Sequence, residues 1–89
     1  MERTVLKITG RVQGVFFRQT AKETAQKLGI AGFAKNENDG NVTIVAEGKK
    51  DKLVQFIGLI KRGFDYTEVK AVSMEWGSAT EEFKDFNIF

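Results

Sequence analysis

The chain contains no cysteine, no histidine and no proline. Without cysteine it can form no disulfide framework and offers no thiol nucleophile. Without histidine it lacks the commonest general base, the commonest metal ligand and any phosphohistidine intermediate. A catalytic triad of the usual kind is therefore excluded, and any chemistry must use other side chains and the backbone.

Long apolar runs and strong charge are also missing. No segment approaches the roughly 20 apolar residues of a membrane helix, and we expect no signal peptide before the first strand-like sequence. The net charge is only +2, with a sequence pI of about 9.0, and no block of five like charges occurs. This balance suits a protein that meets small anions. We expect a cytoplasmic monomer with no membrane partner and no nucleic-acid partner.

The length and composition favour one folded unit. Eighty-nine residues are enough for one domain and not for two, so we expect a single domain over residues 1–89. A hydrophobic content of 42% is ordinary for folded proteins and argues against global disorder.

Hydrophobic periodicity predicts seven elements. Alternating and β-branched segments indicate strands, with a hairpin turn at Asn38-Asp39-Gly40, over residues 4–9, 30–36, 41–47, 68–76 and 83–89. Helical spacing of apolar residues predicts a helix over 17–28 and a second helix through 53–60 that Gly63 ends.

The order of these elements is strand, helix, hairpin, helix, strand, strand. It is the split βαβ pattern of the ferredoxin-like sandwich, an α+β fold, extended by one strand. We predict a mostly antiparallel five-stranded sheet with two helices on one face. Phe17, Phe33 and Phe56 are expected in its core, and Trp76 is expected to pack on a strand face beside Met74.

This topology brings two distant segments together. The first two strands should run parallel through a right-handed crossover, with the third strand between them. Their carboxyl ends would then lie at one edge, about 10 Å apart. The loop Gly10–Phe17 leaves the first of these ends, and Asn36 stands at the second.

The Gly10–Phe17 loop has the character of an anion cradle. It opens a helix, where free N–H groups and the helix dipole favour negative charge. The planar fork of Arg18, in the first helical turn, suits two phosphate oxygens. A plainer interpretation remains open: Gly10 and Gly14 make a turn, Arg18 is solvated surface, and Asn36 belongs to the hairpin turn.

Two longer runs carry a family resemblance. Residues 10–18, Gly-Arg-Val-Gln-Gly-Val-Phe-Phe-Arg, resemble the signature loop of the acylphosphatase family. Residues 32–42, Gly-Phe-Ala-Lys-Asn-Glu-Asn-Asp-Gly-Asn-Val, resemble its second signature. The resemblance covers nearly the whole chain. The chain departs from it at Phe16, where many members have glycine, at Phe33, where a tryptophan-type aromatic is commoner, and at Phe64, where many carry a proline nearby.

The resemblance implies a metal-independent hydrolase without a cofactor, which splits the carboxyl–phosphate bond of acyl phosphates. It implies that Arg18 binds the phosphate and that Asn36 positions the attacking water. The phosphate-binding loop would consist of the backbone amides of Gly14, Val15, Phe16, Phe17 and Arg18. The implied partners are a small acyl phosphate substrate and inorganic phosphate, as product and competitive ligand.

Two other interpretations use the same scaffold without turnover. One is a ferredoxin-like module that binds an anion or RNA, although the chain has no run of the RNA-recognition type. The other is a catalytically idle domain, either regulatory or derived from a larger carbamoyl-transfer protein. Hydrolysis of a synthetic acyl phosphate separates both from the enzyme.

Overall fold

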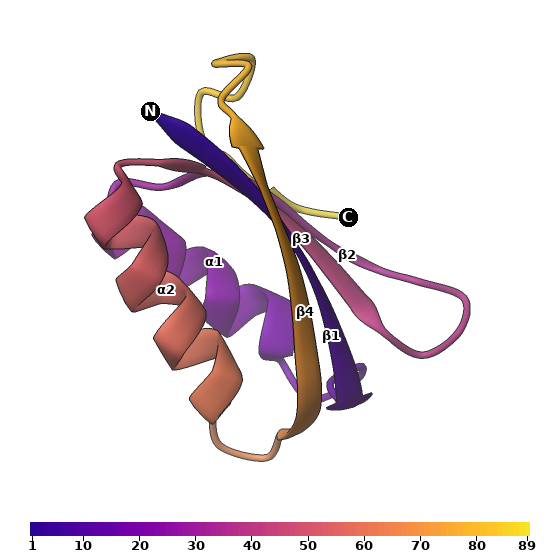
Figure 1. Cartoon of the computed structure of the whole chain (residues 1–89). Helices are drawn as coiled ribbons and strands as arrows, with labels where there is room; N and C mark the ends of the chain where they lie inside the picture. The colour runs from indigo at the N-terminus through magenta and orange to yellow at the C-terminus, as the bar shows by residue number, and fades with distance from the viewer.

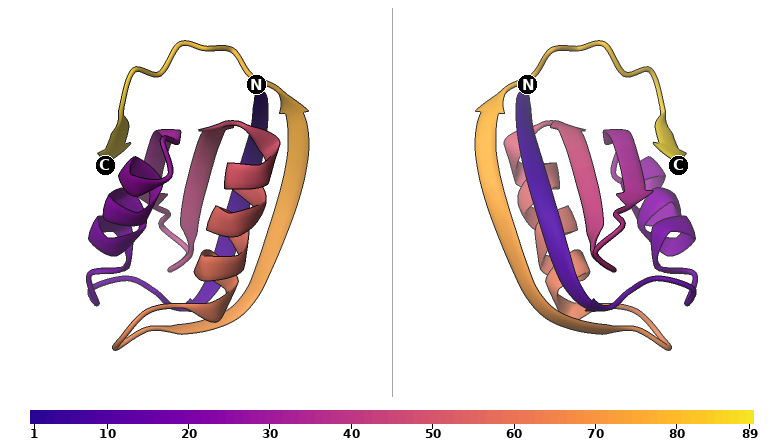
Figure 2. Two further views of the ribbon diagram at one scale, coloured as in Figure 1. Left: turned by 90° about the vertical axis from the view of Figure 1, so that its left-hand side faces the viewer. Right: turned by 90° about the vertical axis from the view of Figure 1, so that its right-hand side faces the viewer.

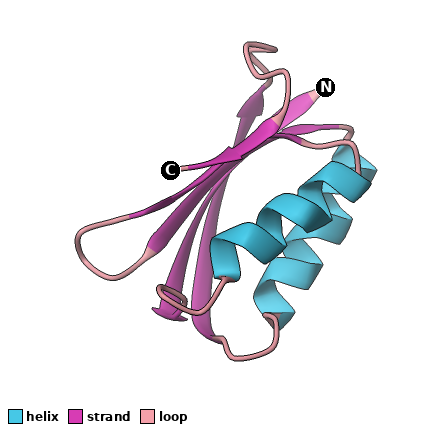
Figure 3. Cartoon of the chain, turned by 180° about the vertical axis from the view of Figure 1, so that it is seen from behind, coloured by secondary structure: helices cyan, strands magenta, loops and turns pink.

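The structure, a computed structural model, describes residues 1–89 and contains one mixed five-stranded sheet with two helices (Figure 1). The elements, in chain order, are β1 (Glu2–Arg11), α1 (Phe17–Lys27), β2 (Ala31–Asn36), β3 (Val42–Gly48), α2 (Lys50–Arg62), β4 (Glu68–Ser78) and β5 (Phe86–Ile88). The strand order is β4-β1-β3-β2-β5, and every neighbouring pair is antiparallel except β2–β5. Both helices lie on the same side of the sheet (Figure 3). The predicted ferredoxin-like α+β fold is confirmed.

Each helix forms because one stripe of its surface is apolar. In α1, Phe17, Ala21 and Ala25 recur every four residues and are buried. In α2, the buried residues follow the i, i+3, i+4, i+7 pattern as predicted: Leu53, Phe56, Ile57 and Ile60. Gly63 ends α2 with a φ of 78°, a left-handed conformation that glycine adopts without steric cost.

The core lies between the helices and the face of the sheet that they cover. Leu6 and Ile8 of β1 and Ile44 of β3 are fully buried in it, together with Phe17 and Phe56. The prediction that Phe33 belongs to this core is wrong. Phe33 alternates with the buried Ala34 and therefore projects from the opposite face. There its ring packs edge-to-face against Phe83 and Phe89 at centroid distances of 5.8 and 5.5 Å.

The boundaries of the first and last strands differ from the predicted ones. β1 continues through Gly10 to Arg11, because it stays paired with β4 beyond an irregularity between Thr9 and Gly10. A Cβ at Gly10 would lie 2.0 Å from the carbonyl oxygen of Glu68, so the close approach of β4 requires glycine there. Gly10 is thus a sheet residue and lies outside the loop. β5 is shorter than predicted, only three residues.

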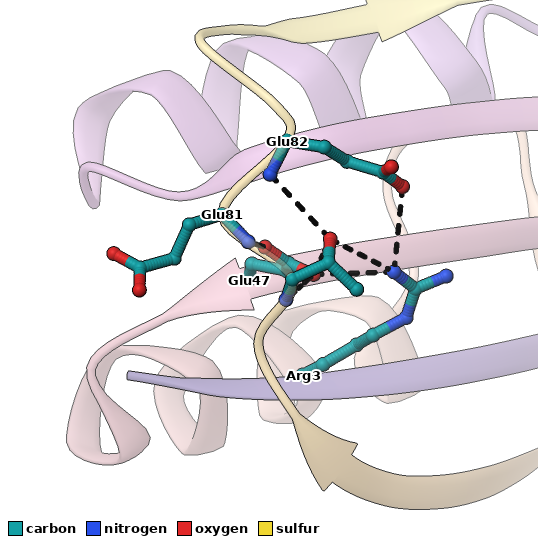
Figure 4. A network of polar contacts seen from close by, with 5 residues as sticks. Arg3, Glu47, Glu81 and Glu82 are labelled. Atoms are coloured by element: carbon teal, nitrogen blue, oxygen red, sulfur yellow. Dashed lines mark hydrogen bonds and ion pairs between the residues drawn. The ribbon is translucent and has the colours of Figure 1, made fainter.

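The segment between β4 and β5 crosses the sheet at the end where β1 begins (Figure 2). A buried carboxylate holds it there (Figure 4). Glu47, 2% exposed, accepts hydrogen bonds from the backbone amides of Thr80 and Glu81, each 2.9 Å long, from the Thr80 hydroxyl and from Arg3. Burial of the Glu47 carboxyl opposes its ionisation, but these hydrogen bonds outweigh burial and hold its pKa below the usual value.

The two edges of the sheet are unequal. β5 closes one side with three residues, whereas β4, at the other side, runs for 11 residues and pairs only with β1. Trp76 of β4 is 41% exposed, more open than the expected packing with Met74 implied. Neither helix has the length and apolar character needed to cross a membrane.

Candidate functional site

The loop between β1 and α1 brings several backbone amides to one place. Gly14 has a φ of 72°, and Phe16, which precedes α1, has a φ of 62° and a ψ of 18°. A left-handed residue followed by the right-handed start of a helix turns successive N–H groups toward a common point, the geometry of an anion-binding nest. For Phe16 this conformation costs about 1–2 kcal/mol, because its Cβ crowds the following carbonyl oxygen.

The amides of this loop have no partner within the chain. None of the backbone N–H groups from Gly14 to Gln19 donates a hydrogen bond to a backbone or side-chain acceptor. The start of α1 also has no side-chain cap and no acidic residue in its first turn. The positive end of the helix dipole is therefore uncompensated, and it favours an anion at this position.

Arg18 stands beside these amides in the first turn of α1. It helps to line a hollow of about 420 Å³ that also includes Gly14, Phe16 and Ile88. Its Nη1 atom donates a hydrogen bond to the main-chain oxygen of Phe89. This contact holds the guanidinium against the end of β5, and its other N–H groups remain free to bind an oxyanion.

Asn36 ends β2, where its backbone pairs with Val42 at the start of β3. Its side-chain oxygen Oδ1 is buried and accepts no hydrogen bond from the chain. A buried amide oxygen without a donor costs about 1–3 kcal/mol. The Asn36 side chain does not line the Arg18 hollow.

Two sets of contacts connect the loop with the backbone on either side of Asn36. The Nε2 atom of Gln13 donates 2.8 Å hydrogen bonds to the carbonyl oxygens of Glu37 and Asn41. Phe89, which accepts from Arg18, donates its own N–H to the carbonyl oxygen of Ala34 at 2.9 Å. The predicted meeting of the first loop with the end of the second strand is therefore observed in the backbone.

Gln13 and Phe89 contribute to this arrangement although no sequence pattern predicts a role for either. Gln13 lies within the first family-like run, but nothing in its spacing indicates that it would bridge to the hairpin. The contact of Phe89 depends on β5 lying beside β2, which the order of the elements alone does not specify. Both residues hold the site together through main-chain groups, which sequence patterns do not reveal.

The chemistry that this site offers is binding and positioning. Its groups are hydrogen-bond donors, with one amide oxygen, and the nearby hydroxyl of Thr20 is engaged with the carbonyl oxygen of Phe16 at 3.0 Å. No three acidic side chains gather anywhere in the chain to form a metal site. The carboxyl of Asp39, in the hairpin turn, has its pKa lowered mainly by the N–H of Asn41, so it serves the turn.

Comparisons of sequence and structure with known proteins give the same result over nearly the whole chain. The acylphosphatase family model matches residues 4–88. An acylphosphatase of Dehalococcoides mccartyi is 44% identical over 82 residues, which cover 91% of this chain and 90% of that protein. One from Thermus thermophilus is 40% identical over 89 residues, 100% of both. The crystal structure of a Bacillus subtilis acylphosphatase superimposes with a TM-score of 0.96 at 35% identity, covering 100% of this chain and 99% of that one.

Proposed function

Since the chain belongs to the acylphosphatase family and is a hydrolase, we propose that it cleaves acyl phosphates by direct attack of water on a phosphoryl group. In this proposal the loop amides and Arg18 bind the phosphoryl oxygens, and Asn36 positions the water. The observation that carries it is the joint presence, at one end of the sheet, of free donors on the loop and a free acceptor at Asn36. The match over residues 4–88 also supports a single acylphosphatase domain over 1–89.

The phosphoryl group would lie in the nest formed by the amides of Gly14 to Arg18. Those N–H groups donate no hydrogen bond within the chain, so they can bind an anion without first breaking a hydrogen bond. Arg18 adds a charged fork whose orientation the Phe89 oxygen already sets. Donors fixed before the reaction stabilise developing charge effectively, because they need not reorganise in the transition state.

The attacking water would donate one of its hydrogens to the Asn36 Oδ1 atom. An amide keeps the same charge at all ordinary pH values, so Asn36 would position the water without ionising. As the water oxygen bonds to phosphorus, the bond from phosphorus to the acyl oxygen breaks. The carboxylate leaves with the electron pair and needs no proton, because its conjugate acid has a pKa near 4. Both protons of the water stay on the inorganic phosphate.

The first experiment measures metal-free hydrolysis of benzoyl phosphate by the intact protein, Arg18→Ala and Asn36→Ala. We expect each variant to lose at least about a hundredfold in rate, equal to about 2.7 kcal/mol of barrier. Arg11→Ala and Asn38→Ala are the matched controls, since both side chains are exposed; they should keep the parental rate. Circular dichroism checks that every variant is folded.

Two further measurements test the same proposal. Activity should persist in excess EDTA, and inorganic phosphate should inhibit competitively, because it would occupy the same amides. A steep requirement for magnesium would contradict the metal-independent mechanism. A folded intact protein without activity would overturn the enzymatic role and leave an anion-binding or interaction role on the same scaffold.

A further inference from the structure

A second hollow, of about 690 Å³, adjoins the Arg18 hollow, and Phe16 lines both. We propose that this second hollow holds the acyl group of the substrate and favours acyl phosphates with an aromatic acyl group. The proposal rests on the proposed function, which places the phosphoryl group on the amides beside Phe16. The carbonyl carbon of an acyl phosphate is only two bonds from phosphorus, so the acyl group must begin next to that residue.

Two exposed aromatic side chains border the second hollow. Phe16 and Tyr66 are 80% and 79% exposed, the most open aromatic residues of the chain. Both also have left-handed backbones, with φ values of 62° and 67°, although neither is glycine. Aromatic surface left in water and strained backbone are both unfavourable for the free protein, and strained residues concentrate at ligand sites. An aromatic ring bound between them would remove part of that exposed surface.

Phe64, which also lines the hollow, is held by contacts on two sides. The ring of Phe64 packs on Phe17, the first residue of α1, at a centroid distance of 5.5 Å. Thr67 closes the turn on Phe64 with its hydroxyl, which lies 2.8 Å from the Phe64 N–H and 2.7 Å from the Phe64 carbonyl oxygen. The turn that carries Tyr66 is therefore tied to the same helix start as the phosphate-binding loop.

A cationic side chain at this hollow can also contact an aromatic ring. Arg62, at the end of α2, lines it together with Asp65, and the Arg62 side chain makes neither a salt bridge nor a hydrogen bond. A free guanidinium stacks well on the face of an aromatic ring. A small acyl group such as acetyl would not reach Tyr66 or Arg62, so these residues would distinguish acyl groups by size and aromatic character.

The test compares kcat/KM for benzoyl phosphate and acetyl phosphate in the intact protein, Tyr66→Gly and Tyr66→Phe. Glycine accepts the positive φ, so the turn should be kept; Tyr66→Asn, whose side chain also tolerates it, is a second variant. We expect Tyr66→Gly and Tyr66→Asn to lower the ratio of benzoyl to acetyl phosphate activity about fivefold, the range of one aromatic contact. Tyr66→Phe should keep it. Trp76→Ala, which removes another exposed aromatic side chain far from the loop, should also leave the ratio unchanged.

The possible results separate this inference from the proposed function. If the intact protein hydrolyses neither compound, both proposals are wrong. If it hydrolyses both and the ratio is the same in Tyr66→Gly, or both activities fall equally, only the acyl site is wrong. Inhibition by phenacylphosphonate, in which CH2 replaces the bridging oxygen of benzoyl phosphate, gives a readout without turnover. It should weaken about fivefold in Tyr66→Gly, whereas inhibition by inorganic phosphate should not change.

Discussion

The two ends of the sheet differ in how their polar groups are satisfied. At the end where β1 begins, Glu47 is buried and its two oxygens accept hydrogen bonds from four donors. At the end where β1 leads into α1, the amides from Gly14 to Gln19 have no acceptor and the Asn36 Oδ1 atom has no donor. The Glu47 carboxylate is satisfied within the chain, although Thr4 Oγ1, near the start of β1, is also buried without a partner. The loop amides, by contrast, are available to a ligand.

The difference shows how a chain of this size combines stability with binding. A domain of about 90 residues has little free energy of unfolding to lose. Unpaired buried groups and the left-handed Phe16 reduce it further, because they lower the stability of the free protein. The Glu47 network opposes that loss at a distance from the loop, where it does not interfere with ligand binding.

Among the substitutions that test this difference between the two ends, Glu47→Ala should change the free energy of unfolding most. The substitution leaves the amides of Thr80 and Glu81 without their acceptor and removes the nearest of the acceptors of Arg3. We expect the free energy of unfolding to fall by about 3 kcal/mol, as for other broken buried ionic networks. Urea unfolding measures it. Arg18→Ala, at the other end, should change stability by less than about 1 kcal/mol. Equal losses in the two variants would show that the ends are not different.

The pH dependence of unfolding sharpens the contrast further. Because folding lowers the pKa of Glu47, its carboxylate stabilises the fold fully above the ordinary glutamate pKa of about 4.3. That contribution is lost as the pH falls through the lower folded value. Glu47→Gln should therefore show a shallower loss of stability between about pH 5 and pH 3, as measured by urea unfolding at each pH. If the free energy of unfolding falls with pH equally in the intact protein and in Glu47→Gln, the charge of Glu47 does not have this role.

The smallest change in the free energy of unfolding is expected for a substitution in the loop between β1 and α1. Phe16→Gly relieves the left-handed strain, which glycine does not feel, but it adds chain entropy to the unfolded state. Since Phe16 is 80% exposed, little buried surface is lost. We expect a net gain of about 0.5 kcal/mol in the free energy of unfolding. A loss of more than about 1 kcal/mol would show that the Phe16 ring stabilises the free protein.

The elements of the fold could be predicted because each has a clear period. The spacing of Leu53, Phe56, Ile57 and Ile60 predicts a helix. The alternation of Val42, Ile44 and Ala46 indicates a strand. The prediction was wrong for Phe33 because both faces of β2 are partly apolar, and Phe33 packs on the face away from the helices, against Phe83 of the crossing segment and Phe89. Hydrophobicity alone does not reveal that second layer.

The candidate site was predictable to a smaller degree. Arg18 and Asn36 were identified through the family resemblance, and their catalytic roles remain predictions. The sequence indicated a glycine loop before a helix, but it could not show that Gly10 serves the pairing of β1 with β4. It could not show the Gln13 bridge or the Glu47 network either, because each depends on a backbone group brought near by folding.

The unequal edges of the sheet have a consequence for concentrated solutions of this protein. A strand at an edge can pair with a second molecule and begin an aggregate. β5 offers only three residues for such pairing, so the 11-residue β4 is the edge through which molecules would associate. Its exposed charged residues, Glu68, Lys70 and Glu75, oppose that contact. The colloidal behaviour of the protein therefore depends on a few charges that have no part in the proposed reaction.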